Sequence, residues 1–239
     1  MSAQPQAPEG SERITPPPKL ERIYHLLLRA YGKPEWKPDG NALGGLVGTI
    51  LSQHTSDVNS ERAYRQLVTT FPTWEEVRDA PVEQVAEAIR SGGLANMKAP
   101  RIQEVLRVLT ARLNGGKLSL DLLKTRTLAE AREYLRSLPG VGPKTVACVL
   151  LFSLGQAAFP VDTHVHRVSK RLGLIGAKVS ADQAHTVFER IVPAEWAYPL
   201  HVNLIRHGRR VCHAQRPDCA RCPLRLECAY YQALEGEQK

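Results

Sequence analysis

Four cysteines lie close together near the end of the chain, in the spacing C-x6-C-x2-C-x5-C. Thiolates at such intervals are typical ligands of a structural Zn²⁺ ion or of a [4Fe–4S] cluster. Thiol chemistry alone leaves zinc and iron–sulfur open, and four core cysteines without a metal are the alternative. We therefore predict a metal centre whose ligands are Cys212, Cys219, Cys222 and Cys228.

Arginines flank these cysteines. Guanidinium groups bind phosphate oxygens well, so a metal-bound loop can present them to a polyanion. The alternative is a solvated basic face without a ligand. The candidates for phosphate contacts are Arg209, Arg210 and Arg216.

A glycine-rich turn, LPGVG, joins two helices that we predict over 128–137 and 143–154. The pattern hydrophobic-x-Gly-hydrophobic-Gly is typical of a helix-hairpin-helix turn. Unpaired amides of the turn and of the new helix start attract anions, phosphate included. The alternative is a tight turn that binds nothing. The turn residues concerned are Gly140, Val141 and Gly142.

Lys144 follows this turn, at roughly the second position of the next helix. The helix dipole and the apolar residues after it disfavour the ammonium form there. An uncharged lysine amine is a nucleophile that can form a Schiff base with a carbonyl. The alternative is a lysine whose ammonium group reaches solvent past the turn.

Asp162 stands just before another predicted helix, where it is expected to be the N-cap. A carboxylate near a buried lysine can also activate the amine or stabilise positive charge that develops on a sugar ring. Lys144 and Asp162 are therefore the candidate catalytic residues.

The elements that must position these residues are predicted to be helical. Apolar residues recur with a period near 3.6 from Leu20 onward, and no alternating strand pair appears. Asn41 is predicted to cap an apolar helix, and Cys148, outside the cysteine cluster, is predicted to lie in the core. The fold class is all-α, behind a proline-rich tail at residues 1–18 that we predict to be disordered.

Composition limits the partner and the compartment. The 239 residues carry a net charge of +8, which favours a polyanionic partner, although an excess of surface Lys and Arg gives the same number. The sequence shows no basic-then-apolar leader and no bilayer-length apolar run, so we expect an intracellular protein without a membrane partner. Its thiols should then be reduced, which favours a metal over disulfides.

The motifs LPGVGPKT and VDTH and the cysteine spacing occur together in the order found in the endonuclease III family of DNA glycosylases, which this sequence resembles over almost its whole length. The resemblance implies the two-lobed, all-α helix-hairpin-helix glycosylase fold, with DNA in the groove between the lobes. It also implies that the metal is a [4Fe–4S] cluster. The implied lobes are a six-helix barrel at 38–156 and a discontinuous lobe of 19–37 with 157–239, which carries the cluster loop 212–228.

The resemblance further implies a mechanism. The damaged base is flipped out of the stack, Lys144 attacks C1′ of its deoxyribose, the base leaves and a Schiff base remains. β-Elimination then cuts the strand on the 3′ side, and Asp162 activates the lysine and stabilises positive charge. The family's gap-filling segment corresponds to LSQHTSD, in which Gln53 or His54 would fill the gap and Asp57 is the segment's aspartate. The family's wedge leucine corresponds to Leu94 in GLANMKA.

The resulting hypothesis is a base-excision repair enzyme, a bifunctional glycosylase and abasic-site lyase for oxidised pyrimidines. One alternative is a non-catalytic DNA-binding module in which Lys144 only contacts phosphate. Another is an abasic-site lyase with weak or mismatch glycosylase activity. We expect a monomer in the cytoplasm, associated with the nucleoid, whose partner is double-stranded DNA with damaged bases or abasic sites.

Overall fold

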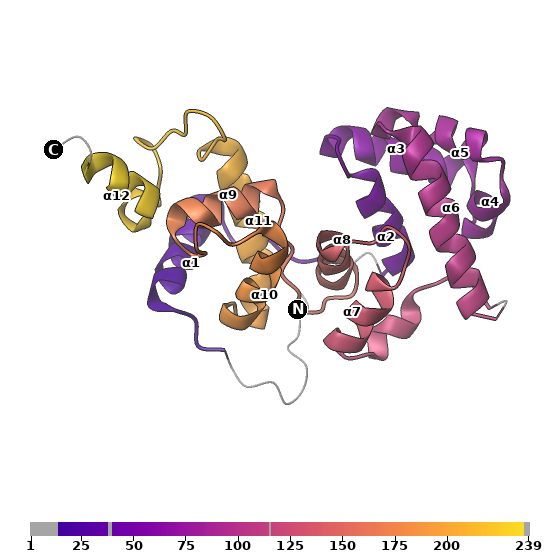
Figure 1. The fold of residues 1–239 in the computed structure, drawn as a ribbon, viewed down its shortest axis with the longest axis horizontal. Helices are drawn as coiled ribbons and strands as arrows, with labels where there is room; N and C mark the ends of the chain where they lie inside the picture. Colours follow the sequence, from indigo (N-terminus) through magenta and orange to yellow (C-terminus); the bar gives the residue numbers. More distant parts are fainter. Residues whose placement is uncertain (1–13, 38–39, 115, 237–239) are drawn as a thin grey trace. The chain divides into compact units, whose positions relative to one another are not determined.

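The structure is a computed structural model that describes residues 14–37, 40–114 and 116–236. Over these residues the regular elements are all helices, and β-strands are absent from them (Figure 1). The predicted all-α class is confirmed. Among the same residues, none of the helices combines the length and the apolar character needed to cross a bilayer.

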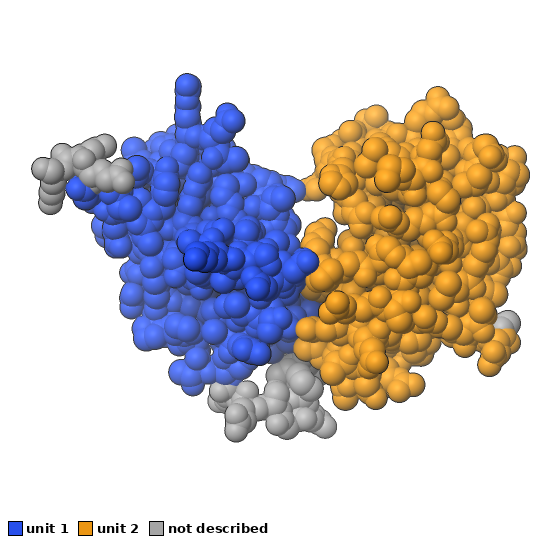
Figure 2. Space-filling model, in the orientation of Figure 1, with its two compact units in different colours: residues 1–37, 150–239 blue, residues 38–149 orange. Residues whose placement is uncertain are grey.

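The chain forms two compact units (Figure 2): unit 1 comprises residues 1–37 and 150–239, and unit 2 comprises residues 38–149. Unit 2 ends at Val149, whereas the predicted barrel runs to residue 156. The difference arises because Leu151 is buried in the hydrophobic core of unit 1. Most of the predicted tail lies outside the described residues, and its last residue, Pro18, already begins a helix.

Unit 2 is organised around its first helix, α2, which is buried along most of its length. Asn41 caps α2 as predicted, because its Oδ1 accepts a hydrogen bond from the Gly44 amide at 2.8 Å. The apolar helix α2 packs against α3, α6 and α8. The elements of unit 2 are α2 (Ala42–Leu51), α3 (Asp57–Thr70), α4 (Trp74–Asp79), α5 (Val82–Ala88), η1 (Arg90–Gly92), α6 (Ala95–Arg112), η2 (Asp121–Thr125), α7 (Leu128–Arg136) and α8 (Pro143–Cys148).

Unit 1 is discontinuous in sequence, because α1 from the start of the chain packs on α11 and η4 near its end. Its core includes the stacked rings of Phe159 and Phe188. A π-helical turn, η3 (Val149–Ser153), follows α8 directly and replaces the end of the helix predicted over 143–154. The other elements are α1 (Pro18–Tyr31), α9 (Thr163–Leu172), α10 (Ala181–Ile191), α11 (Ala194–Arg210), η4 (Arg225–Glu227) and α12 (Ala229–Gly236).

Candidate active site and metal centre

The glycine-rich turn connects α7 to α8 in unit 2. A reciprocal capping box between Thr127 and Glu130 starts α7, because each side chain bonds the other residue's backbone amide. Gly140 has φ +67, and a Cβ there would lie 2.5 Å from Nε of Arg101. Glycine is therefore favoured at residue 140 by the left-handed backbone, and a Cβ there would also displace the end of the Arg101 side chain.

The start of α8 is built as the sequence predicts. Gly142 is its N-cap and Pro143 its first residue, where a missing amide hydrogen is tolerated. A Cβ at Gly142 would meet no heavy atom within 4 Å, so the approach to this backbone is open. Arg101, which the sequence analysis missed, adds a positive group beside the turn. The turn can therefore receive an anion such as a phosphate.

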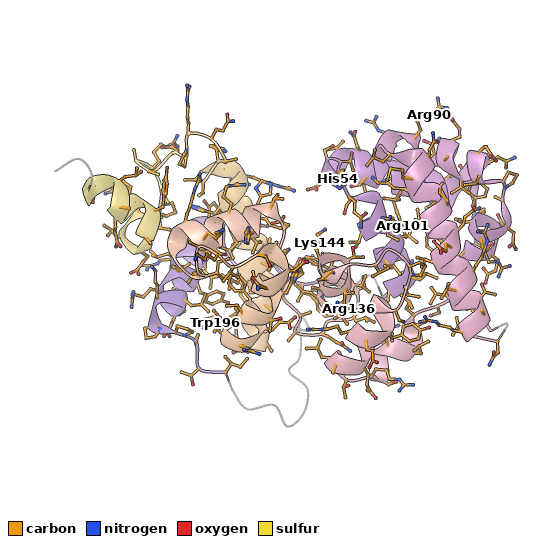
Figure 3. All side chains as sticks on the ribbon, in the orientation of Figure 1. His54, Arg90, Arg101, Arg136, Lys144 and Trp196 are labelled. Carbon is orange, nitrogen blue, oxygen red and sulfur yellow. The ribbon has the colours of Figure 1, made fainter. Side chains whose placement is uncertain are left out.

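Lys144 is the second residue of α8 and is half-buried, while Thr145 and Val146 after it are fully buried. Its Nζ has no hydrogen bond or ion pair to any residue that the structure describes. Figure 3 shows Lys144 and His54 along the same edge of unit 2. An amine that is partly shielded from solvent and makes no hydrogen bond or ion pair with a described residue is suited to nucleophilic attack.

The segment between α2 and α3 lies next to the start of α8. Gln53 Nε2 donates a hydrogen bond to Thr145 Oγ1 at 3.3 Å, which places this segment beside the residue that follows Lys144. His54 is exposed and has φ +54, a conformation that non-glycine residues rarely adopt. Asp57 is exposed as the first residue of α3. Backbone strain at an exposed side chain is a feature of functional positions.

Leu94 shows the same combination of strain and exposure. It precedes α6 with φ 52 and ψ 34, and 49% of its surface is exposed. The left-handed backbone disfavours a non-glycine residue, and it presents an apolar side chain to solvent at this position. These features suit the wedge role that the resemblance implies for Leu94.

Lys98 is a second functional candidate that the sequence analysis missed. It is buried, and its Nζ donates hydrogen bonds to the carbonyls of Leu51 and Gly92. A signal was present, because Lys98 falls in phase with the buried apolar residues Ile102 and Val105 on one face of α6. A charged residue on an apolar stripe calls for buried hydrogen-bond partners.

Asp162 belongs to unit 1 and is the N-cap of α9, as predicted. Its Oδ1 accepts a hydrogen bond from the Val165 amide at 2.7 Å, and the side chain is half-buried. This bond orients the carboxylate and engages only one of its two oxygens. Lys144 lies in unit 2, so each of the two candidate catalytic residues is positioned by its own unit.

The four clustered cysteines of unit 1 line one pocket beside α9 and α11. All four are free thiols, and burial raises the pKa of the Cys222 thiol to about 11. Within the described ranges, no three His, Cys, Asp or Glu side chains are arranged around one point as a single metal ion requires. Four thiols around one pocket are a donor set that suits either a structural zinc ion or a [4Fe–4S] cluster.

Two arginines of α9 hold the cysteine loop. Arg171 donates hydrogen bonds to the Cys212 Sγ at 3.3 Å and to the His213 carbonyl at 2.6 Å. Arg167 donates to the carbonyls of Cys212 and Gly208. Arginine side chains thus orient the loop from the neighbouring helix. Cys148, by contrast, is buried in unit 2, as predicted.

The flanking arginines fall into two groups. Arg209, Arg210 and Arg216 are exposed and can reach an external anion. Arg206 is half-buried, and its guanidinium donates hydrogen bonds to Tyr31 O and Asn203 Oδ1 within unit 1. The first group remains the set of candidates for phosphate contacts, whereas Arg206 bonds within unit 1.

Comparison with known proteins identifies the family. Residues 47–194 match the model of the HhH-GPD superfamily base excision DNA repair proteins. Endonuclease III of Thermotoga maritima is 33% identical over 78% of this chain and 82% of its own length. A candidate DNA glycosylase of Arabidopsis thaliana is 39% identical over 71% of this chain, which spans 57% of that protein.

A solved structure points the same way. A structure of endonuclease III trapped as a covalent intermediate with DNA is 30% identical and superposes with a TM-score of 0.75, over 91% of this chain and 98% of that one. The family model alone covers more than half of the residues. The chain therefore belongs to the HhH-GPD superfamily of base excision DNA repair enzymes, as an endonuclease III-like DNA glycosylase.

Proposed function

We propose that this glycosylase is bifunctional, removing oxidised pyrimidines and cutting the resulting abasic site through a Schiff base on Lys144. The observation that carries the proposal is the Lys144 amine, half-buried at the start of α8 and without a partner among the described residues. The similar endonuclease III structure was trapped as a covalent intermediate with DNA, which supports a covalent route here.

In the proposed reaction, Lys144 Nζ attacks C1′ of the flipped nucleotide and the bond from C1′ to the base breaks. The base leaves with the bonding electrons and takes up a proton. The amine loses one proton, and the bond between C1′ and O4′ breaks as O4′ takes up a proton, which gives a protonated Schiff base between Nζ and C1′. Loss of a proton from C2′ then expels the 3′ phosphate. The Asp162 carboxylate accepts a proton from the amine or stabilises the cationic sugar.

Recognition of damaged duplex is assigned to both units. The amides from Gly140 to Gly142 receive a backbone phosphate, and the exposed Arg209, Arg210 and Arg216 neutralise others. Gln53, His54 and Leu94 fill the space that the flipped nucleotide leaves, with Asp57 at the start of α3 behind them. The partner is double-stranded DNA with a damaged base or abasic site, bound by a monomer in the cytoplasm.

The proposed cofactor is a [4Fe–4S] cluster held by Cys212, Cys219, Cys222 and Cys228. The cluster would have a structural or DNA-sensing role rather than a part in the chemistry on the base. Arg167 and Arg171 orient the loop that presents the thiols.

Borohydride trapping tests the proposal. The wild-type protein should form a covalent adduct with a duplex containing one abasic site, because reduction fixes the Schiff base. Lys144→Gln should abolish both the adduct and strand cleavage, while Lys117→Gln, which changes an exposed lysine of the same unit, should retain both. A wild-type protein that binds the duplex without forming an adduct would be a non-catalytic module.

A panel of duplexes, each with one defined lesion, tests the substrate class. Oxidised pyrimidines such as thymine glycol should be released faster than mismatched or undamaged bases. Cleavage of preformed abasic sites without release of oxidised pyrimidines would instead identify a lyase with weak or mismatch glycosylase activity.

A further inference from the structure

Lys98 ties together two segments that are distant in sequence. Its Nζ donates hydrogen bonds to the Leu51 carbonyl at 2.7 Å and to the Gly92 carbonyl at 2.8 Å. Leu51 is the last residue of α2, and Gly92 is the last residue of η1. The side chain is only 4% exposed, so it does not contact an external ligand in this conformation.

Each bonded carbonyl stands just before a strained and exposed residue. His54, with φ +54, follows Leu51 by three residues, and Leu94, with φ +52, follows Gly92 by two. Strained backbone persists only where its surroundings fix it. Because one ammonium group binds both helix ends, the starting points of the two strained segments are fixed relative to each other.

Lys98 binds the two carbonyls with a charged group although the side chain is buried. Burial lowers the pKa of Lys98, so desolvation works against its charged form. Farther along α6, Gln103 also binds two backbone carbonyls, but with a neutral amide, which donates to the carbonyls of Val77 and Ala80. The ammonium group makes stronger, charge-assisted bonds than a neutral amide. Lys98 makes these bonds at the two helix ends that precede His54 and Leu94.

We propose that Lys98 is a positioning residue that holds the gap-filling segment and the wedge leucine in fixed register, so that both enter the duplex together. The inference depends on the proposed DNA contacts of Gln53, His54 and Leu94. Lys98 itself touches neither DNA nor the reacting atoms. Its loss should impair opening of the duplex while leaving the chemistry of Lys144 intact.

Lys98→Met tests the proposal, because it keeps the chain length and removes the ammonium group. Single-turnover cleavage of an abasic site in duplex DNA should slow by about 10- to 100-fold, the cost expected when reacting groups are misplaced. Cleavage of the same site in single-stranded DNA, which needs no duplex opening, should keep its wild-type rate. Gln103→Met is the matched control, since it removes a buried pair of bonds elsewhere on α6 and should leave both rates unchanged.

Hydrogen exchange provides a second readout that does not depend on activity. The amides of residues 52–56 and 93–94 should exchange faster in Lys98→Met but not in Gln103→Met. The more conservative Lys98→Gln, which retains a donor, covers the case in which the methionine variant does not fold. It should show smaller changes in the same direction.

The outcomes of these experiments separate the positioning role of Lys98 from the proposed lyase function of Lys144. Equal slowing on duplex and single-stranded DNA, or the same duplex defect in Gln103→Met, would overturn the positioning role. So would unchanged duplex rates and exchange in both Lys98 variants. A wild-type protein that cleaves neither substrate would instead contradict the proposed lyase function.

Discussion

The hairpin of unit 2 and the cysteine loop of unit 1 carry the two strongest motifs of the chain, but they are stabilised differently. The hairpin is held by regular helices, by the capping box of α7 and by the buried residues of α8. The cysteine loop has only the short η4 as regular structure between α11 and α12, and its thiols are half-buried or buried around one pocket.

This difference indicates which of the two sites reaches its conformation without a bound metal. The backbone that presents Lys144 is fixed by helix caps and by packing, neither of which requires a bound metal. In the loop, burial raises the pKa of Cys222 and disfavours its thiolate, and a bound cation would offset that cost. We therefore expect the hairpin to be preorganised and the loop to depend on its metal.

Loss of the cluster should give the largest effect and should be confined to unit 1. Cys222→Ser should lose the broad visible absorbance and iron of the proposed cluster and destabilise unit 1 by several kcal/mol, because metal binding contributes directly to folding. Exchange of the α8 amides should remain slow. Cys148→Ala, which changes the buried cysteine of unit 2, is the control and should keep the absorbance. A colourless wild-type protein prepared anaerobically with iron would favour zinc instead.

Substitution of the hairpin glycine should have the next largest effect. Gly140→Ala should cost about 1–2 kcal/mol of unfolding free energy, because alanine disfavours the left-handed backbone. Its Cβ would also displace the Arg101 side chain and weaken DNA binding. Gly142→Ala is the matched control, since its φ of −85 is ordinary and its Cβ has open space. Denaturant titration measures the unfolding free energy of both variants. Equal losses of unfolding free energy would show that the left-handed turn conformation is not critical.

The exposed arginines of unit 1 should have a smaller, salt-dependent effect. Arg209→Ala and Arg216→Ala should each weaken binding to damaged and undamaged duplex alike, and each should reduce the salt slope by about one unit for every phosphate that is no longer neutralised. Arg206→Ala should mainly affect stability, because its guanidinium bonds within unit 1. Binding measured by anisotropy at several salt concentrations tests this, and unchanged slopes would assign the arginines to a solvated face.

The capping box should give the smallest effect and a characteristic pH dependence. Hydrogen bonds from Thr127 lower the pKa of Glu130, so its carboxylate stabilises the folded state. That contribution is present above the pKa of the unfolded chain and is lost as the pH falls through the lowered folded value. Glu130→Gln should therefore lower the Tm slightly near neutral pH and leave it unchanged in strong acid. A Tm difference between the wild-type protein and Glu130→Gln that persists in strong acid would contradict a role for the Glu130 charge.

Local features of the site could be predicted from the sequence because they depend on residues close in the chain. Asn41 and Asp162 cap the helices that follow them, and Gly140 and Pro143 shape the hairpin. In each case the side chain or backbone preference acts within a few residues. The resemblance built on these motifs also led to the correct family.

Contacts between distant segments were decided only by the tertiary structure. The pairing of Lys98 with Leu51 and Gly92 requires α2, η1 and α6 to be packed first. The left-handed backbone at His54 and Leu94 is likewise seen only in the structure, because neither residue type requires it. The sequence by itself therefore determined the helices, their caps and the ligand spacing. Packing determined which cations are buried and which exposed side chains are held in strained conformations, because those properties depend on neighbours that the local sequence does not specify.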